Sequence, residues 1–547
     1  MKRIVALVLC VVLMVGLIAG CGKGGVKKGD GSTLKIGLCT SALIEDYDTN
    51  MFTKWIEEQS GYQIEFQFFS SQSSEAKSQI ATMIAAGEEL PDILWGVDFG
   101  KEVYTEYGDD GYFLDLKEYF DDKKGASKVF WDRFAELPEE DQDRAMRNMV
   151  NPDSGAMYAL PTLQYSEIDV MDYMMFINQD WLNKLGLSMP NSLEELYNVL
   201  VAFRDRDPNG NGRKDEIPFI GCNSLSGHVI NYILNQFLYF NEEKSFGIKD
   251  GKLTTPFTSN EYREGLKYAN KLVNEGLLSS LSLTTNATTL KGYICPTTDA
   301  SGNINDSDIL VGCFVGHPTL VIEPNNPALY KYTAMNYWSN SVITNNQQVY
   351  RTFITEDCED PDAAWNFLMN FYTEEASLRL RYGEKGVDWD DADKGTKSFI
   401  GYDAQIKVIN QVWANQNNST WGNIQSTILY YAENEVTQIE DVSKWQDYLN
   451  KQFTATHDNY FAAAEKYNPK EKLSAIVLTT EESEQYSMTI SNCKSHISNS
   501  RTSFVTGTLN PNSDSDWNEY LKKLDDLGLK TWLSVAQKAY DRQNNLK

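Results

Sequence analysis

The residues after position 32 alternate between strand-like and helix-like patterns, and this order constrains the fold more than any other feature of the chain. Thr33–Leu38 is a short apolar run, Asn50–Gln59 carries apolar residues at helical spacing, and Tyr62–Phe69 alternates as a strand does. A second helical pattern at Ser74–Ala86 leads to a third strand-like run at Asp92–Trp95. Strands that alternate with helices form a parallel sheet with crossover helices, so the sequence predicts an α/β fold.

The length of the chain predicts more than one lobe. At 547 residues it exceeds the size at which a single hydrophobic core is normally built. Helical patterns dominate the later part of the chain, and no internal repeat or low-complexity segment is visible. These patterns cover residues 193–203, 229–240, 261–275, 361–372 and 516–539.

The N-terminus has the pattern of a bacterial lipoprotein signal. Lys2 and Arg3 precede an apolar stretch, residues 4–20, that is short for a membrane span. Ile-Ala-Gly before Cys21 resembles a lipobox, so we predict a signal peptide over residues 1–20 and a lipid on the Cys21 thiol. Residues 21–32 are rich in Gly and Lys and predict a flexible tether. The alternative is an ordinary secretory signal with a chance cysteine.

The charge of the chain restricts its partners. The formal net charge is −28, which disfavours nucleic acid, since that binding depends on Lys and Arg at the phosphates. It also disfavours a strongly anionic ligand, unless a local basic pocket overrides the average. Aromatic residues make up 12% of the chain, including 12 Trp and 30 Tyr. A secreted, acidic and aromatic-rich protein suits a neutral polar ligand such as a sugar.

The cysteines do not have the spacing of a metal site. Past the proposed lipid site at Cys21 no two of them form a CxxC pair, and a domain of this size can build its core without disulfides. We expect most of them to be buried thiols, while one or two bridges stay open as an alternative. They are Cys39, Cys222, Cys295, Cys313, Cys358 and Cys493.

No pattern in the sequence predicts an enzyme. The four histidines lie outside any H-E-x-x-H motif, and there is no G-x-S-x-G elbow, phosphate-binding loop or G-x-G-x-x-G after a strand. A glycosidase or lyase needs only two carboxylates at the right separation, and the chain has 77 acidic residues. A secreted carbohydrate-active enzyme is therefore kept as the alternative, together with a surface lipoprotein of structural or adhesive role.

An oxygen-rich loop, DPNGNGRKDE, occupies residues 207–216. Asp and Asn alternate at its start, and two further acidic residues close it. Calcium takes about six to eight oxygen ligands, and a tight loop can bring alternate side chains to one point. We predict a structural Ca²⁺ held by side-chain oxygens and, at Arg213, by the main-chain carbonyl. The predicted ligands are Asp207, Asn209, Asn211, Arg213, Asp215 and Glu216.

Two alternatives for this loop stay open. In an earlier register Asp205, Asp207, Asn209, Gly210 and Glu216 also match the EF-hand expression. The other alternative is a solvated Asn/Gly turn without a metal. The later register uses Gly212 at the sharp turn and brings in both acidic residues at the end of the loop.

The calcium loop ends a longer block that carries a family resemblance. NQDWLNKLGL at residues 178–187, P-x-S-L-E-E-L at residues 190–196 and DPNGNGRKDEIP at residues 207–218 follow one another in this order. TLKIGLCTS at residues 33–41, LPDILWG at 90–96, MYALP at 157–161 and residues 516–542 extend the match over nearly the whole mature chain. Together they resemble the lipoprotein solute-binding subunits of bacterial carbohydrate ABC importers, extracellular solute-binding family 1. The calcium loop is similar to that of the alginate-binding members.

This resemblance implies a two-lobed, type II periplasmic-binding-protein-like fold with a hinge and a ligand cleft between discontinuous lobes. We assign residues 33–163 and 328–385 to the N-terminal lobe, and residues 164–327 and 386–547 to the C-terminal lobe. The chain would cross near Thr162–Asp169, Pro324–Thr333 and Arg381–Asp393.

The resemblance also implies a function. A monomer without enzymatic activity, lipid-anchored on the extracellular face of the bacterial cytoplasmic membrane, would bind a neutral oligosaccharide. It would then deliver this ligand to the permease subunits of an ABC transporter.

A sugar-binding site needs flat apolar faces and convergent hydrogen-bonding groups, and in α/β sheets these follow the carboxyl ends of strands. Trp95 with Asp98 follows the third strand, and Ser41 to Asp46 follow the first. Gln164 and Tyr165 lie where the family's chain crosses to the second lobe. We predict all of these residues to contact the ligand.

Three further tryptophans lie in polar loops without apolar periodicity. Trp338 is in NYWSNS, Trp389 in YGEKGVDW and Trp421 in NNSTWGN. We predict that they and Trp95 supply stacking surface for the sugar, with lobe packing as the alternative for each. Three other tryptophans lie on apolar helical faces and are assigned to the core: Trp55, Trp181 and Trp365.

Overall fold

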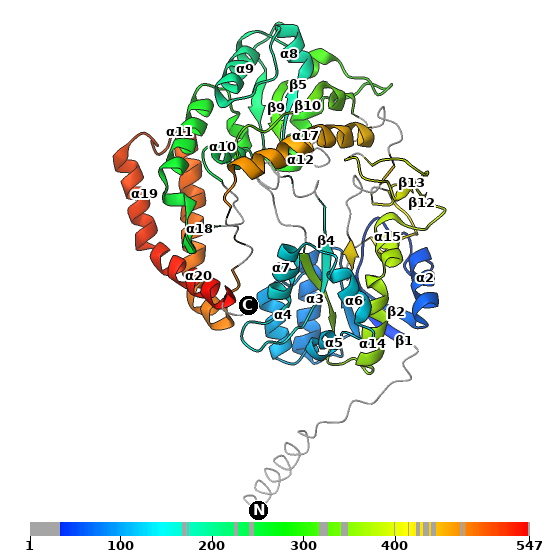
Figure 1. Cartoon of the computed structure of the whole chain (residues 1–547). Helices are drawn as coiled ribbons and strands as arrows, with labels where there is room; N and C mark the ends of the chain where they lie inside the picture. Colours follow the sequence, from blue (N-terminus) through cyan, green and yellow to red (C-terminus); the bar gives the residue numbers. More distant parts are fainter. Residues whose placement is uncertain are drawn as a thin grey trace, which may run out of the picture.

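The computed structural model shows a chain of two α/β lobes (Figure 1). It describes residues 33–544, with the exception of residues 167–170, 172–173, 224–227, 240–244, 317–325, 341–347, 399, 414, 423–426, 430–436, 439–444, 471–472 and 474–475. The signal peptide, the tether and Cys21 lie outside the described residues. Among the helices of the described part, none combines the length and apolar character that a membrane span requires.

The first lobe is built on a six-stranded sheet of order β14-β4-β11-β3-β1-β2. Strand β1 pairs in parallel with both β2 and β3, and β11 runs antiparallel between β3 and β4. The crossovers between the first strands are α2 (Met51–Ser60) and α3 (Ser73–Ala86), so the predicted α/β fold is confirmed. The strands are β1 (Thr33–Cys39), β2 (Gln63–Phe69), β3 (Ile93–Trp95), β4 (Leu160–Gln164), β11 (Gln348–Ile354) and β14 (Ile428–Leu429).

Helices cover both faces of this sheet (Figure 1). Those that follow β3 are α4 (Lys101–Asp109), α5 (Lys117–Asp121), α6 (Lys128–Phe134) and α7 (Glu139–Met149). Those that follow β11 are α14 (Pro361–Met369) and α15 (Glu374–Tyr382), and a two-stranded ribbon of β12 (Trp389–Asp391) and β13 (Ile406–Val408) comes next.

The second lobe has a four-stranded sheet of order β10-β5-β9-β6. Its strands are β5 (Met175–Asn178), β6 (Ile217–Ile220), β9 (Val311–Val315) and β10 (Tyr332–Ala334). Its helices are α8 (Gln179–Leu185), α9 (Leu193–Asp205), α10 (Val229–Asn235), α11 (Asn260–Asn274), α12 (Ala287–Ile294) and α17 (Trp445–Tyr467), and β7 (Gly247–Lys249) and β8 (Lys252–Thr254) form a hairpin.

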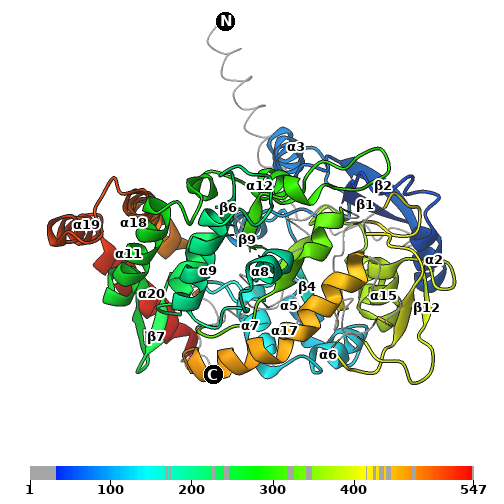
Figure 2. The same ribbon diagram turned by 90° about the horizontal axis from the view of Figure 1, so that it is seen from above.

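Three long helices at the end of the chain extend this lobe. They are α18 (Thr480–Thr506), α19 (Asp514–Asp526) and α20 (Leu529–Asn544), shown in orange and red in Figure 1 and seen from above in Figure 2. Helix α18 packs against α11, and the Asn270 side chain on α11 donates to the last carbonyls of α18, at Phe504 and Val505.

Short-range signals set the helix ends in the block that carries the resemblance. The Asn178 side chain accepts from Trp181 N and starts α8, which ends at Gly186 with φ 68°. The Ser192 hydroxyl accepts from Glu195 N and starts α9. Side-chain oxygens of Asn and Ser satisfy helix N–H groups, and glycine ends a helix in the left-handed region at little cost.

Each lobe has its own hydrophobic core. Trp181 belongs to the core of the second lobe and Trp365 to that of the first, as predicted, while Trp55 is partly buried beside the latter. No disulfide joins the six cysteines of the described part, and five of them are buried. The cores explain how both lobes are stable without covalent cross-links.

The second crossing between the lobes lies later than predicted. Tyr332–Ala334 pairs with Asn178–Phe176 in the second sheet, and the chain re-enters the first sheet only at Gln348. The predicted boundary at 328 is therefore too early, while the crossing begins within about ten residues of the predicted one near Pro324–Thr333, the margin to which sequence sets such boundaries. The first crossing falls between Gln164, at the end of β4, and Met175, at the start of β5.

The third crossing also lies later than predicted. β14 pairs in parallel with β4 in the first sheet, and Trp421 is part of the first lobe's core. In the segment of residues 386–429, Trp421 and β14 thus belong to the first lobe, and the crossing lies between Leu429 and α17 rather than near Arg381–Asp393. This segment contains only short strands and loops, whose pairing partners are distant in sequence and leave no periodic pattern.

Candidate functional site

The carboxyl ends of β1, β3 and β4 lie at one edge of the first sheet, because these strands run in the same direction. The chain leaves β4 from this edge toward the second lobe (Figure 1). The loops after β1 and β3 therefore face the other lobe. This is the position in which open α/β sheets bind ligands.

Arg351 and Asp98 form an ion pair at this edge. The register between β11 and β4 shifts between Tyr350 and Thr352, so Arg351 is the extra residue of a bulge. Its carbonyl accepts from Gly96 N at 2.8 Å and from Val97 N at 3.1 Å. Its Nη2 donates to Asp98 Oδ2 at 2.8 Å, and the two side chains are 33% and 48% exposed. A bulge re-aims a side chain, and here it directs a guanidinium to the loop after β3.

The Arg351 guanidinium has more N–H donors than its bond to Asp98 uses. Its Nε is enclosed and has no hydrogen-bond partner among the described residues. The position of Asp98 after a strand indicated a site residue, whereas nothing in the sequence indicated Arg351. Arg351 and its partner Asp98 are 253 positions apart, and the bulge has no local sequence signal.

The loop after β1 is held by its own hydrogen bonds. Ser41 N donates to the Tyr47 hydroxyl at 2.8 Å, and the partly exposed Ser41 hydroxyl accepts from Leu43 N at 3.3 Å. The exposed Asp46 carboxylate accepts from Asp48 N at 2.8 Å and ends the loop as a turn. Gln164 and Tyr165 are partly exposed at the end of β4, where Tyr165 N donates to Leu429 O.

Trp95 and Trp421 lie in the interior of the first lobe. Both are 0% exposed, and their rings meet edge to face with centroids 5.1 Å apart. Trp421 Nε1 donates to the Thr53 hydroxyl at 2.8 Å. The prediction that these two rings offer stacking surface is wrong for this structure, because neither has an exposed face.

Trp389 is also buried, at 3% exposure, and its Nε1 donates to Gly383 O at 2.8 Å. It packs with Tyr382 and Ile406 in a small cluster, so the same correction applies. Trp338 differs. It is partly exposed, and its indole Nε1 is enclosed without a partner among the described residues.

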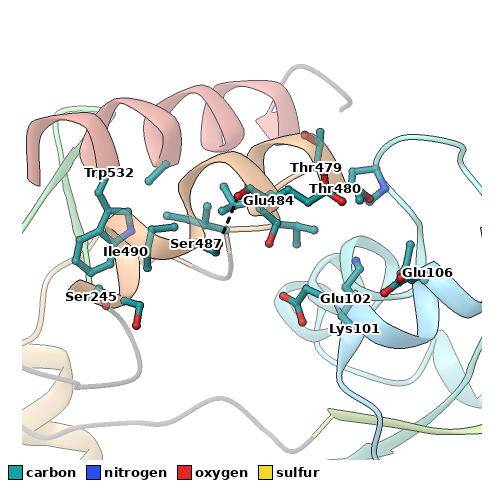
Figure 3. A pocket seen from close by; sticks show the side chains of 18 of the residues that line it. Lys101, Glu102, Glu106, Ser245, Thr479, Thr480, Glu484, Ser487, Ile490 and Trp532 are labelled. Carbon is teal, nitrogen blue, oxygen red and sulfur yellow. Dashed lines mark hydrogen bonds between the residues drawn. The ribbon is translucent and has the colours of Figure 1, made fainter. Parts of the chain in front are cut away.

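A cavity of 1180 Å³ lies between the lobes. One wall is α4 of the first lobe, and the other is formed by α18 and α20 of the second (Figure 3). Figure 3 shows Lys101, Glu102 and Glu106 facing the start of α18, while Ile490 and Trp532 line the opposite end. The cavity thus combines charged groups with an apolar wall.

The electrostatics of this cavity are acidic. Glu102, Glu106 and Glu484 line it together with Asp109 and Asp110. Two lysines, Lys101 and Lys494, also line it, so the five acidic residues outnumber them. The Lys101 Nζ donates to the carbonyls of Arg147 and Val150 at the end of α7. Burial lowers the pKa of Lys101 to about 8. The lining therefore repels an anionic ligand.

The predicted calcium loop connects α9 to β6. Asp207 has a positive φ of 46°, and its carboxylate accepts from the main-chain N–H groups of Gly210, Asn211 and Gly212. The Asn211 amide donates to Asp215 Oδ1 at 3.0 Å, and Arg213 Nε donates to Asp215 Oδ2 at 2.7 Å. The loop is thus folded around its acidic side chains.

The end of the loop contains an unsatisfied carboxylate. Glu216 Oε1 is buried and has no hydrogen-bond partner among the described residues. Burial and the nearby Asp207 and Asp215 charges raise the pKa of Glu216. Within the described part no three His, Cys, Asp or Glu side chains are arranged as a metal site. In this loop the available oxygens belong to Asn amides as well as to carboxylates, and calcium accepts both kinds of ligand. A bound cation would offset the repulsion between Glu216 and the Asp207 and Asp215 carboxylates.

The chain thus has two α/β lobes with a cavity between them. No family model matches the chain. It is 23% identical over 528 residues to the fructooligosaccharide ABC transporter substrate-binding protein FusA of Streptococcus pneumoniae, covering 93% of this chain and 90% of the relative. It is 28% identical over 271 residues to lipoprotein LipO of Bacillus subtilis, covering 48% and 49% of the two chains.

Solved structures show the same fold. An extracellular solute-binding protein from Bifidobacterium longum subsp. infantis matches with a TM-score of 0.72 at 19% identity, over 93% of this chain and 98% of that chain. The S. pneumoniae FusA structure in complex with kestose matches with a TM-score of 0.68 at 21% identity, over 94% and 100%. An EF-hand mutant of FusA also matches, with a TM-score of 0.66 at 21% identity over the same shares. The predicted relationship to solute-binding proteins of ABC transporters is confirmed.

Proposed function

We propose that this chain is an extracellular solute-binding subunit that captures an oligosaccharide and delivers it to the permease of an ABC transporter. The observation that carries the proposal is the end-to-end similarity to FusA in a chain whose two lobes enclose a cavity. FusA is a fructooligosaccharide-binding protein by name, and its relatives in the comparison are binding proteins rather than enzymes.

The cavity supports a neutral sugar as ligand. Its acidic lining favours a neutral oligosaccharide over a polyuronate, since like charges in a partly enclosed space repel. Its volume exceeds that of a pocket for one small molecule, which suits a chain of several sugar units.

The sheet edge, whose residues are not among those that line this cavity, offers hydrogen-bonding groups at a separate place. The Arg351 guanidinium and the Asp98 carboxylate are planar and partly exposed, and together they offer donors and acceptors to sugar hydroxyls. We place Ser41, Asp46, Gln164 and Tyr165 around them. Among the predicted tryptophans only Trp338 is partly exposed, while part of it packs against the core of the second lobe, and we propose its exposed part for stacking.

The lobes work by closing over the ligand. A ligand that contacts both walls of the cleft binds the closed form better than the open form, so it shifts the population toward closure. The closed, loaded form is then the one that a permease recognises.

A structural Ca²⁺ would bind at residues 207–216. Asp207, Asn209, Asn211, Asp215 and Glu216 would hold it with the Arg213 carbonyl, and it would neutralise the acidic end of the loop. The buried, unsatisfied Glu216 oxygen supports this site. The EF-hand mutant made of FusA and the structure of alginate-binding AlgQ2 without calcium point to such sites in proteins of this fold.

A lipid on Cys21 would tether the protein to the membrane, as LipO's description as a lipoprotein suggests for a relative. Mass spectrometry of the native N-terminus should find the modified cysteine. Cys21→Ala should move the protein from the membrane fraction to the medium, and retention of the variant in the membrane would contradict the lipobox.

The functional test is a calorimetric titration of the protein lacking residues 1–21. Kestose, a neutral trisaccharide, and trigalacturonate, a trisaccharide with three carboxylates, form the matched pair. We expect saturable binding of kestose or a related neutral oligosaccharide, no binding of trigalacturonate, and no product by chromatography. Cleavage of the sugar would support a carbohydrate-active enzyme instead. The absence of both binding and cleavage with every neutral oligosaccharide would support a structural or adhesive lipoprotein.

A further inference from the structure

At the rim of the cavity the first lobe contacts the second through the carboxylate of Asp153. Asp153 follows α7, and its Oδ2 accepts a hydrogen bond of 2.8 Å from Thr480 N. Thr480 is the first residue of α18, which belongs to the second lobe. Thr480 and Pro152, the neighbour of Asp153, both line the cavity.

The first lobe presents Asp153 on a braced loop. Asn151 is 2% exposed, and its amide donates to both oxygens of Asp109 at 3.2 and 3.3 Å. The Asn151 side-chain oxygen accepts from Asp153 N at 2.9 Å, and its main-chain carbonyl accepts from Gly155 N. A buried side chain thus sets the turn from which Asp153 projects.

In the second lobe, the start of α18 is also held by several side-chain interactions. Thr479 and Glu482 form a capping box at this end of the helix. The Glu482 carboxylate also accepts two bonds of 3.0 Å from Arg542 on α20, and Lys538 lies 3.2 Å away. These cations and the cap lower the pKa of Glu482 to about 2. The helix start is therefore fixed to α20.

The contact joins complementary charges. The first N–H groups of a helix have no partner within the helix, and the helix dipole places partial positive charge there. Asp153 supplies a negative charge and an acceptor to one of these groups from the other lobe. This bond requires the end of α7 and the start of α18 to lie within hydrogen-bond distance, as they do in this structure.

We propose that Asp153 and the first N–H of α18 form a latch that holds the lobes in the arrangement that encloses the ligand. The proposal rests on the proposed function for its link to sugar binding, but the latch itself operates without a ligand. It stabilises the closed form, so a protein without it spends more time open and binds its sugar more weakly.

Two single substitutions remove the latch from opposite sides. Asp153→Ala removes the acceptor. Thr480→Pro removes the donor. Proline is tolerated at the first position of a helix when the preceding residue is extended. Thr479 meets this condition, with φ −70° and ψ 164°. Asn260→Pro is the matched control, because Asn260 is the exposed first residue of α11 and follows Ser259 with φ −80° and ψ 157°.

The first readout needs no ligand. Spin labels at Lys117→Cys on α5 and Lys522→Cys on α19, both exposed, report the distance between the lobes by pulsed electron resonance. The protein without these two cysteines gives the background from native thiols. We expect a longer or broader distribution for Asp153→Ala and Thr480→Pro, and the parental distribution for Asn260→Pro.

The second readout is the Kd for kestose. We expect each single variant to weaken binding about threefold, as an exposed charge at a helix end does, and the double variant to be no weaker than either single one. Parental distances in both single variants, additive losses in the double variant, or tighter binding would each overturn the latch. If the parental protein binds no neutral oligosaccharide, the proposed function fails while the distance measurement still decides on the latch.

Discussion

Replacing Trp421 with alanine should unfold the first lobe rather than merely weaken ligand binding. The indole is fully buried and meets Phe52, Phe66 and Trp95 edge to face at centroid distances of 5.3, 5.6 and 5.1 Å. It also carries the hydrogen bond to Thr53. Trp421 thereby ties the segment after β13 to the helix after β1.

The cost follows from the burial. A tryptophan side chain removes up to about 250 Å² from water, which at about 25 cal/mol per Å² is worth up to about 6 kcal/mol. Partial collapse of the cavity lowers the measured loss, and buried Trp→Ala changes cost about 3–5 kcal/mol. The Thr53 hydroxyl keeps its bond of 2.7 Å to Tyr47 O, so little is added for an unsatisfied polar group.

The assay is urea unfolding followed by circular dichroism, with kestose titration on the same samples. We expect Trp421→Ala to lose about 3–5 kcal/mol of unfolding free energy in the first lobe, and Trp421→Phe to lose less than half of that. An Ala variant that keeps its unfolding midpoint but no longer binds sugar would refute the assignment of Trp421 to the core and restore it as a ligand platform.

Three further outcomes are expected. Trp338→Ala should weaken kestose binding about tenfold, as burying an apolar ring face is worth about 1–3 kcal/mol, with no change in melting temperature; a lower melting temperature with normal binding would assign Trp338 to packing. Chelation with EDTA should lower the melting temperature, because calcium at a hundredfold over Kd adds about 2.7 kcal/mol, and Asp207→Ala should abolish this response; a purified protein that holds no metal and shows no shift would refute the calcium site. Glu482 has a pKa of about 2 against an ordinary value of 4.5, so its contribution to stability is complete above pH 4.5 and is lost as the pH falls toward 2. The difference in unfolding free energy between the parental protein and Glu482→Gln should therefore become smaller over that range. A difference that stays constant would contradict the ion pair.

Local patterns in the sequence were enough to predict three strands of the first sheet, β1, β2 and β3, and the two helices between them. The alternation over residues 33–95 predicted β1, α2, β2, α3 and β3 in their order, because each element carries its own periodic pattern. The caps at Asn178 and Ser192 likewise depend on residues within a few positions. The same holds for the calcium loop, whose conformation is set by Asp207 and its adjacent main chain.

The features that the sequence did not predict depend on contacts between residues far apart in the chain. Trp421 lies in a polar stretch, yet its partner Thr53 is 368 positions away and draws it into the core. Arg351 owes its direction to a bulge against β4 and its partner to the loop after β3. The apolar wall of the cavity comes from helices at the end of the chain, and their position against α4 depends on how the lobes stand together.

The most direct test of the account is a crystal structure of the protein lacking residues 1–21 with a bound neutral oligosaccharide. We expect an intact sugar between the lobes, hydrogen bonds to Arg351 and Asp98, and the ring of Trp338 against a pyranose or furanose face. A cleaved sugar, or a sugar bound on the outer surface of one lobe with the cleft left open, would contradict capture between the lobes.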